Sequence, residues 1–206
     1  MVPKMAAAAG AQSIRTLTGF KWLARPIVDQ ADATYVFGYE EALGYSIGDR
    51  VRDKDGISAA LLIAEAAAEF KVAGKTLIDR LDELYAQVGV HLTGQVVVDL
   101  TLRDEASRQE IKANALSLAP SAIGGNPVLE REDLTEGRHL PPTAGTIISL
   151  EDQSRIVIRP SGTEPKIKVY VEVVVPVTND VGLAKAEGQH KLESLKQWVE
   201  GQLAFG

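Results

Sequence analysis

The period of the hydrophobic pattern changes near the middle of the chain. Upstream of Gly89, apolar side chains recur at spacings of three and four residues, which is the period of an α-helix. From Val96 onward they form short runs such as VVVDLTL, which are typical of strands. The change predicts a domain boundary at residues 89–94, and we expect one domain over residues 1–91 and another over residues 92–206.

The N-terminal part alternates short elements with loops. Residues 1–11 predict a short alanine-rich helix, and residues 13–17 predict a strand. A second β-type run, residues 33–37, ends at the loop 38–41, which carries two adjacent carboxylates. A strand that presents acidic residues at its end is a candidate for a ligand-binding loop.

Two helices complete the first half. Asp55 can cap a helix over residues 57–70, and this helix is apolar around most of its circumference, so we expect it to be buried on most sides. A second helix follows Gly74 with one apolar stripe, and Gly89 supplies its C-terminal stop.

The second half reads as strands interleaved with two helices, separated by a Gly-Gly-Asn-Pro break at residues 124–127. The predicted strands cover residues 96–102, 147–150, 155–158 and 167–175, and the predicted helices cover residues 105–118 and 181–203. This order predicts a small α+β domain with an antiparallel sheet.

Composition excludes several classes of protein. The 206 residues carry 22 basic and 28 acidic side chains, a net charge of -6, with no Lys/Arg block and 5% aromatics. The electrostatic footprint of a nucleic-acid binder is therefore missing. No apolar run approaches the ~20 residues of a membrane-spanning helix. We expect neither nucleic acid nor a membrane as a partner.

Cysteine and histidine usage bounds the chemistry further. The chain has no cysteine, which removes disulfides, thiolate zinc sites and cysteine nucleophiles, and which fits a cytoplasmic location. Its histidines, His91, His139 and His190, are far apart and lie in no spaced ligand motif. We expect no metal site in this chain.

The segment RPSGTEPK, from Arg159 to Lys166, concentrates groups that bind phosphate. Gly162 lets backbone N–H groups approach an anion, Ser161 and Thr163 offer hydroxyl donors, and the Arg and Lys supply positive charge. Two prolines stiffen the segment. The alternative is a plain β-hairpin turn, since Pro, Ser, Gly and Thr are turn residues.

Three further segments carry weaker signals. The loop GYEEALG (residues 38–44) presents carboxylates that could grip sugar hydroxyls or form a solvated turn. The segment TGFK could direct Lys21 at a ligand, or that lysine could be an exposed structural residue. The charge cluster RDKDG (residues 52–56) is explained by helix capping, and its two aspartates lack the third carboxylate expected of a magnesium loop.

Read together, four segments in order resemble the C-terminal half of the α-D-phosphohexomutases, the family of phosphoglucomutase and phosphomannomutase. The segments are TLTGFKW (residues 16–22), FGYEEALG (37–44), VRDKDG (51–56) and RPSGTEPK (159–166), and the last is the most specific. The resemblance covers nearly the whole chain. It implies an incomplete third mutase domain, with a mixed α/β sheet, followed by a small fourth α+β domain with an antiparallel sheet.

The resemblance also implies an activity. Enzymes of this family move phosphate between the 1 and 6 positions of a hexose through a bisphosphorylated intermediate, using a phosphoserine and a magnesium loop on their first two domains. In this chain Lys21 would line the cleft near the reacting groups and Glu40 would grip the sugar hydroxyls. The phosphate that is not transferred would be held by Arg159, Ser161, Gly162, Thr163 and Lys166.

The chain departs from the family pattern in the sugar loop. Many relatives carry Glu-x-Ser-Gly-His where this chain has Glu40-Glu41-Ala42-Leu43-Gly44. The serine hydroxyl and the imidazole are therefore missing, and glucose, mannose and pentose phosphates stay open as substrates. The Glu-Glu-Ala-Leu-Gly form is closer to the phosphoglucomutase branch that also contains phosphopentomutases, so glucose phosphate is our first expectation.

A larger departure is the lack of any segment that resembles Thr-Ala-Ser-His-Asn-Pro or Asp-Gly-Asp-x-Asp-Arg, the phosphoserine and magnesium loops. We therefore expect the chain alone to be inactive and the Mg²⁺ of the complete enzyme to be bound by the missing N-terminal mutase domains. The chain would be a fragment, a gene model begun at an internal methionine, or half of a split enzyme. The alternatives are a non-catalytic phosphosugar-binding module and a structural domain in which residues 159–166 are only a turn.

A missing strand and helix would have a physical consequence. The apolar helix around residues 57–68 would lose part of its cover. We expect an exposed patch there and a homodimer formed through it.

Overall fold

The computed structural model of the chain describes residues 1–30, 32–41 and 43–203. These residues form two units, one made of Met1–Ala9 with Leu84–Gly206 and the other of Gly10–Glu83. The division lies within helix α5 (Leu77–Val88). The domain limits of residues 1–91 and 92–206 stay a prediction.

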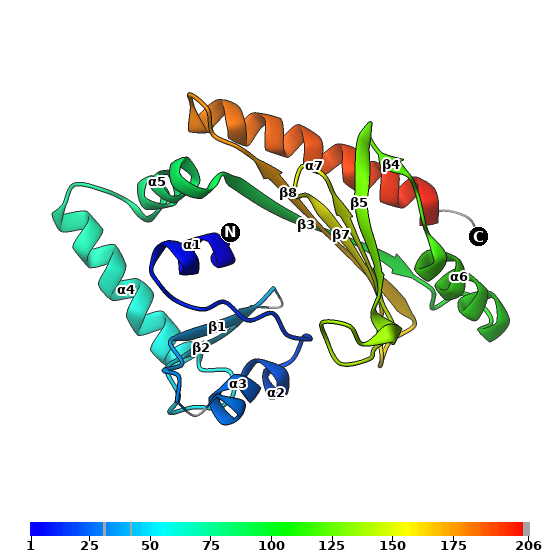
Figure 1. Cartoon of the computed structure of the whole chain (residues 1–206), viewed down its shortest axis with the longest axis horizontal. Coiled ribbons are helices and arrows are strands. Elements are labelled where there is room, and N and C mark those ends of the chain that lie inside the picture. Colours follow the sequence, from blue (N-terminus) through cyan, green and yellow to red (C-terminus); the bar gives the residue numbers. More distant parts are fainter. Residues whose placement is uncertain (31, 42, 204–206) are drawn as a thin grey trace. The chain divides into compact units, whose positions relative to one another are not determined.

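The unit Gly10–Glu83 holds one hairpin and three further helices (Figure 1). Its elements are α2 (Phe20–Leu23), α3 (Arg25–Asp29), β1 (Phe37–Glu40), β2 (Gly44–Ile47) and α4 (Gly56–Val72). The two strands pair antiparallel, with Phe37 opposite Ile47 and Glu40 opposite Gly44. Helix α4 begins at its predicted cap, because the Asp55 carboxylate accepts hydrogen bonds from the amides of Ile57 and Ser58.

Two strand predictions in this unit are wrong. Residues 13–17 form no regular element, because no described strand pairs with them. The run predicted at residues 33–37 ends where strand β1 begins, so Gly38, Tyr39 and Glu40 lie in the strand and not in the following loop. The pairing with β2 sets these limits, and neither strand's own sequence reveals its partner.

Helix α4 is confirmed, but its predicted burial is wrong. None of its residues is buried; Ile57 is 87% exposed and Leu61 62% exposed. The exposed apolar patch expected around residues 57–68 is therefore confirmed. The helix α5 is also confirmed, and Gly89 ends it with a φ of 91°.

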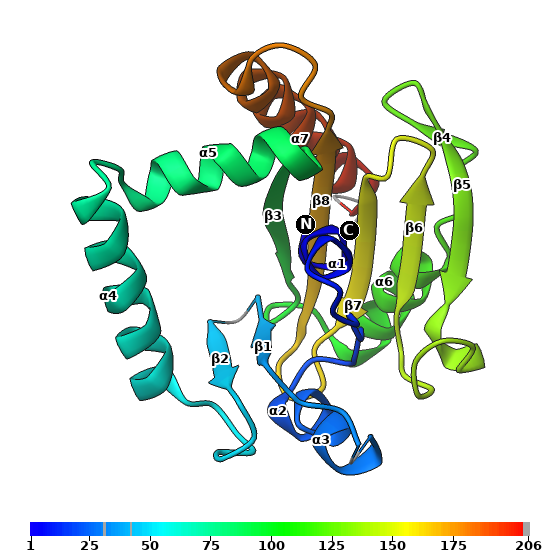
Figure 2. The same ribbon diagram turned by 60° about the vertical axis from the view of Figure 1, so that its left-hand side comes forward.

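The other unit is built on a six-stranded antiparallel sheet with the order β3-β8-β7-β6-β5-β4 (Figure 2). Its strands are β3 (Val90–Asp99), β4 (Ala122–Ile123), β5 (Asn126–Asp133), β6 (Thr146–Leu150), β7 (Arg155–Pro160) and β8 (Lys166–Val175). Its helices are α1 (Val2–Ala8), α6 (Glu105–Ser117), α7 (Val181–Leu203) and the 3₁₀ turn η1 (Leu134–Glu136).

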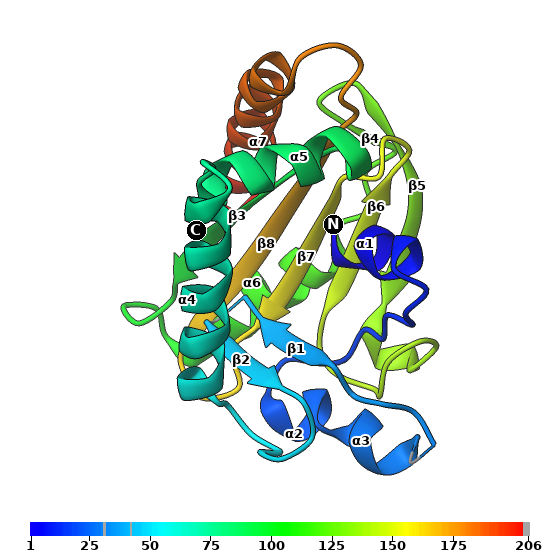
Figure 3. The same ribbon diagram turned by 90° about the vertical axis from the view of Figure 1, so that its left-hand side faces the viewer.

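The core of this unit lies between one face of the sheet and the helices α6 and α7. Alternate residues of the central strands point into it, including Ile156 and Ile158 from β7 and Val169 from β8, and Leu195 and Val199 meet them from α7. Helices α7 and α1 lie on opposite faces of the sheet (Figure 3). The sheet face that α7 leaves uncovered carries charged side chains at alternate positions.

The predicted α+β arrangement of this unit is confirmed, with corrections at three places. Strand β3 spans Val90–Asp99 and not residues 96–102, so the predicted boundary falls partly inside it. Gly94, at the end of the predicted boundary, lies inside β3; a Cβ there would lie 3.2 Å from Leu192 Cδ1, so the missing side chain lets α7 pack closely. The break at 124–127 is a tight turn between β4 and the unpredicted strand β5, with φ of 57° at Gly124 and 80° at Gly125.

No helix in the described part of the chain is both long and apolar enough to cross a bilayer.

Candidate functional site

The segment RPSGTEPK forms the connection between β7 and β8. Its first two residues end strand β7 and Lys166 begins strand β8, so the loop itself comprises residues 161–165. Pro160 lies opposite Ile167, and the Ser161 amide donates to the Lys166 carbonyl at 2.8 Å. The Ser161 amide is therefore used within the hairpin.

The loop has a fixed base and a free tip. At the base, the Leu100 amide donates to the Pro165 carbonyl at 2.8 Å, and the Lys166 amide donates to the Glu164 carbonyl at 2.8 Å. At the exposed tip, the amides of Gly162 and Thr163 have no hydrogen-bond partner among the described residues. Two adjacent, unpaired N–H groups are available to an anion.

Gly162 is not required by contacts within the chain. A Cβ built on Gly162 would meet no heavy atom within 4 Å, and its φ lies outside the left-handed region. What the glycine provides is access to the backbone of the tip, which is the property a bound anion requires.

Two cations face each other across the hairpin just behind the loop. Arg159 on β7 lies directly opposite Lys168 on β8, and both side chains are half-buried. Neither forms an ion pair or side-chain hydrogen bond with another described residue, and the neighbour of Lys168 on its other side is Val97. Like charges at directly opposed positions repel, so the pair favours an anion placed between or above them.

Lys168 is a residue that the sequence reasoning missed. Its spacing of two from Lys166 puts both lysines on one face of β8, and this alternation was the available signal. The pairing with Arg159 depends on the strand register, which the sequence alone does not give.

The Lys166 ammonium already has a partner. Its Nζ donates to Glu164 Oε1 at 3.1 Å. This hydrogen bond and the charge of Glu164 raise the pKa of Lys166. The charge of Asp99, which lies opposite Lys166 on β3, adds to the effect. In the absence of ligand, the loop thus neutralises one of its cations internally.

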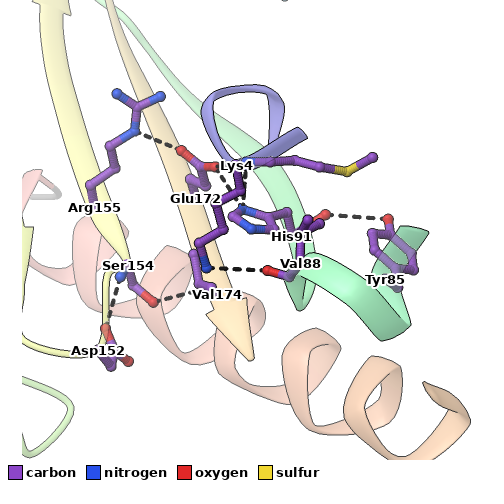
Figure 4. A network of polar contacts seen from close by, with 10 residues as sticks. Lys4, Tyr85, Val88, His91, Asp152, Ser154, Arg155, Glu172 and Val174 are labelled. Carbon is purple, nitrogen blue, oxygen red and sulfur yellow. Dashed lines mark hydrogen bonds and ion pairs between the residues drawn. The ribbon is translucent and has the colours of Figure 1, made fainter. Parts of the chain in front are cut away.

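A closed network lies at the other end of the same two strands (Figure 4). Arg155 on β7 is opposite Glu172 on β8, with Nε 2.7 Å from Oε2, and His91 Nδ1 lies 3.2 Å from Oε1. Burial alone would raise the pKa of Glu172, but the hydrogen bond with His91 and the charge and hydrogen bond of Arg155 outweigh it and lower the pKa to about 2. The charges of Arg155 and Glu172 are therefore paired with each other, whereas the buried Nε2 of His91 has no hydrogen-bond partner among the described residues.

In the unit Gly10–Glu83, the predicted sugar-binding carboxylate is buried and bonded. Glu40 Oε2 accepts a hydrogen bond from the Gly19 amide at 2.9 Å, and Oε1 lies 3.0 Å from Lys54 Nζ. A Cβ on Gly44 would lie 2.4 Å from the Phe20 ring and 3.0 Å from Glu40 Oε1, so that glycine makes room for the cluster. Glu40 therefore ties the Thr-Gly turn to strand β1.

Lys21 follows that turn on helix α2. It is exposed, and its Nζ lies 5.4 Å from the centre of the Trp22 ring. The Gly19–Glu40 hydrogen bond places the turn that precedes Lys21 beside Glu40, although no hydrogen bond or ion pair joins the Lys21 and Glu40 side chains in the described part of the chain, whereas the five residues from Arg159 to Lys166 lie in the other unit.

The sugar loop contains one strained residue. Leu43 has a φ of 60°, in the left-handed region that favours glycine, and it is 79% exposed. It occupies the place where many phosphohexomutases carry glycine. Ala42, which precedes it, lies outside the described residues.

The acidic side chains do not assemble into a metal site. In the part of the chain that the structure describes, no three His, Asp or Glu residues are placed to hold a metal ion. Asp53 accepts from the Lys54 amide at 2.7 Å and Asp55 caps helix α4, so both have local structural roles. These residues therefore do not fit a magnesium ion.

Two family models match the chain. One, "Phosphoglucomutase/phosphomannomutase, alpha/beta/alpha domain III", matches residues 1–88, and the other, "Phosphoglucomutase/phosphomannomutase, C-terminal domain", matches residues 101–177. The first match contains Glu40 and Lys21, and the second contains the loop and Lys168.

Curated relatives agree with these matches. A "Probable phosphomannomutase" of Haemophilus influenzae is 36% identical over 165 residues, covering 78% of this chain and 31% of the relative. A "Phosphoglucomutase" of Staphylococcus aureus is 37% identical over 180 residues, covering 80% of this chain and 32% of the relative. The chain thus spans about a third of the length of the curated relatives that it matches.

A solved structure shows the same fold. The open form of pp63/parafusin, a phosphoglucomutase from Paramecium, matches 98% of this chain and 36% of its own, with a TM-score of 0.63 and 19% identity. The fold is an α/β domain followed by an α+β domain. The chain belongs to the phosphoglucomutase/phosphomannomutase family and matches its domain III and its C-terminal domain.

Proposed function

We propose that this chain supplies the phosphate-binding and sugar-binding surfaces of a phosphohexomutase that interconverts hexose 1-phosphate and hexose 6-phosphate. The observation that carries the proposal is the opposed pair of Arg159 and Lys168, which has no carboxylate partner among the described residues. The pair lies on the two strands that lead into the loop with the unpaired amides of Gly162 and Thr163. A phosphate near -2 charge complements this combination of fixed cations and free N–H donors.

The loop would hold the phosphate that is not being transferred. The amides of Gly162 and Thr163 donate to its oxygens, the hydroxyls of Ser161 and Thr163 add two donors, and Arg159 can contact two oxygens at once. Lys166 exchanges Glu164 for the phosphate or bridges the two. The rigid base of the loop reduces the conformational entropy lost on binding.

The sugar would be recognised by the other unit. A carboxylate oxygen can accept more than one hydrogen bond, so Glu40 retains acceptor capacity beyond its bonds to Gly19 and Lys54. These two bonds fix its orientation, and Lys21 lines the same cleft. Glucose phosphate is the proposed substrate, with mannose and pentose phosphates as the outcomes that a substrate panel would distinguish.

The chemical step is assigned to other parts of the enzyme. This sequence has no segment like the phosphoserine loop or the aspartate-rich magnesium loop of the family. We therefore propose that the chain alone does not turn over glucose 1-phosphate, that the Mg²⁺ and the phosphoserine belong to the N-terminal mutase domains, and that the enzyme works in the cytoplasm.

We also propose that a second copy of the chain covers helix α4. Support comes from the exposure of Ile57, Leu61, Leu62 and Ile63 along this helix, since a helix that is apolar all round is normally buried. Sedimentation should show a dimer, and Leu61→Glu should convert it into a monomer. A monomeric wild-type chain at high concentration would contradict this.

The phosphate proposal is tested by calorimetric titration with glucose 1-phosphate. Arg159→Ala should weaken binding by about 1.5–3 kcal/mol, the usual worth of a hydrogen bond between charged groups, or roughly ten- to a hundredfold. The control is Arg138→Ala, which removes an exposed arginine paired with Glu136. Unchanged affinity after Arg159→Ala would overturn the assignment of the loop.

A further inference from the structure

The loop at residues 161–165 is supported by the turn that follows strand β3. The Leu100 amide donates to the Pro165 carbonyl at 2.8 Å, and no other backbone hydrogen bond joins the described loop residues to a segment outside the hairpin. The Leu100 side chain is 1% exposed and packs in the hydrophobic core. This bond therefore adds a link between the loop and a buried residue outside the hairpin, beside the two strands that hold the ends of the loop.

Arg108 holds that turn from helix α6. Its Nε donates to the Leu100 carbonyl at 3.0 Å, and its Nη2 donates to the Thr101 carbonyl at 2.8 Å. The Arg108 side chain is partly exposed, at 27%, and its other terminal nitrogen lies 3.6 Å from Glu105. A planar guanidinium that binds two successive carbonyls restrains the two peptide units that carry them.

We infer that Arg108 is a positioning residue for phosphate binding, although it does not contact the phosphate itself. It holds the Leu100 carbonyl, which lies in the peptide unit after the one whose N–H donates to Pro165. By restraining the backbone on that side of Leu100, it limits how far the Leu100 N–H can turn away from Pro165 and thereby helps to set the position of the loop base. Binding sites require their groups within about 0.5 Å of the productive geometry. The inference rests on the proposed function, because it presumes that the loop binds phosphate.

The chain offers a matched control for this role. Arg131 on β5 makes the same kind of fork, with Nε donating to the Leu118 carbonyl at 3.0 Å and Nη2 to the Leu116 carbonyl at 2.7 Å. Strand β5 is separated from β7 by β6, and Leu116 and Leu118 lie at the C-terminal end of α6. Loss of the Arg131 fork thus removes equivalent hydrogen bonds without touching the loop.

The test compares Arg108→Gln with Arg131→Gln in the full chain, at a temperature where both are folded. Calorimetric titration with glucose 1-phosphate should show about tenfold weaker binding for Arg108→Gln and less than about a twofold change for Arg131→Gln, where tenfold corresponds to 1.4 kcal/mol. Amide hydrogen exchange should accelerate at Leu100 in Arg108→Gln alone. Arg108→Lys, which cannot make the fork, is the second variant if Arg108→Gln does not fold.

The outcomes separate the inference from the proposed function. If Arg159→Ala weakens binding but Arg108→Gln and Arg108→Lys do not, the positioning role is wrong and the loop assignment stands. Equal weakening by Arg108→Gln and Arg131→Gln would also overturn the positioning role, because the loss would then reflect general destabilisation. If Arg159→Ala leaves binding unchanged, the proposed function fails and the inference fails with it.

Discussion

The two ends of the β7–β8 strand pair carry the same kind of cation in opposite surroundings. At one end Arg155 faces Glu172 across the strands, with an ion pair of 2.7 Å, and His91 completes the network. At the other end Arg159 faces Lys168, and no described carboxylate pairs with either of them. Both arginines lie on the same face of β7, since they are an even number of residues apart.

The partner across the strands distinguishes a charge that stabilises the fold from a charge that is available to a ligand. A charge whose partner belongs to the chain stabilises the fold, and its loss leaves a half-buried group unpaired. A charge that faces a like charge lowers the stability of the fold, and a bound anion can offset that repulsion. The register across the strands, and not the residue type, decides between these roles.

The largest effect should come from giving Arg159 a carboxylate partner at the loop end of the β7–β8 pair. Lys168→Glu gives Arg159 an internal partner and places a negative charge where the phosphate should bind. We expect affinity for glucose 1-phosphate to fall by at least about a hundredfold, or ~2.7 kcal/mol, while thermal stability rises slightly. Calorimetry and thermal unfolding measure both effects.

The control for this variant is Lys168→Arg, which preserves the charge and should retain binding. Undiminished binding by Lys168→Glu would show that the cation pair is not part of the site.

The Arg155–Glu172 end of the β7–β8 pair should control the stability of the fold and its dependence on pH. The pKa of Glu172 is lowered from its ordinary value of 4.5 to about 2, so its carboxylate stabilises the fold above about pH 5, and this contribution is lost as the pH falls towards 2. Glu172→Gln should cost roughly 2 kcal/mol at pH 7 and flatten this acid dependence. Urea unfolding between pH 3 and 7 provides the measurement.

For comparison, Glu151→Gln changes an exposed carboxyl in the turn before β7 and should alter the unfolding free energy by less than about 0.5 kcal/mol. An acid dependence that persists unchanged in Glu172→Gln would mean that other carboxylates cause it.

A third test extends the comparison to the sugar loop. Glu40 is buried and bonded to Gly19 and Lys54, so Glu40→Ala should destabilise the chain by about 1.5 kcal/mol even without ligand. The matched variant Glu41→Ala changes the exposed neighbouring carboxylate and should have little effect on stability. Chemical unfolding of the two variants decides, and equal stabilities would contradict the structural role of Glu40.

The smallest effect concerns the internal partner of Lys166. Glu164→Gln releases this ammonium from an exposed ion pair, and exposed pairs contribute little to stability. Affinity for glucose 1-phosphate should therefore rise about twofold. A fall in affinity would indicate that Glu164 orders the loop for binding.

Strong local patterns predicted much of the fold. Helix α7 was expected over residues 181–203 and occupies Val181–Leu203, because its apolar stripe has the helical period throughout. The segment from Arg159 to Lys166 is rich in turn residues, and residues 161–165 within it form the loop between β7 and β8, whereas Pro160 still ends strand β7. In these places the local sequence and the tertiary structure agree.

The features that local sequence patterns do not predict depend on contacts between residues that are distant in the chain. The role of Lys168 follows from its register with Arg159, and the burial of Glu40 follows from the turn that folds over it. Gly94 falls in the predicted domain boundary but lies inside β3, where it allows close packing of α7. None of these contacts leaves a periodic trace in the local sequence, so pattern reasoning found the loop and missed part of the site.

The most direct test of the phosphate site is an amide proton–nitrogen NMR titration of the wild-type chain with glucose 1-phosphate. We expect the amide signals of Gly162 and Thr163 to shift furthest, because before the ligand binds these N–H groups have no hydrogen-bond partner among the described residues. The Ser161 amide, already bonded to the Lys166 carbonyl, should shift less. Binding that leaves the Gly162 and Thr163 signals in place would contradict the account.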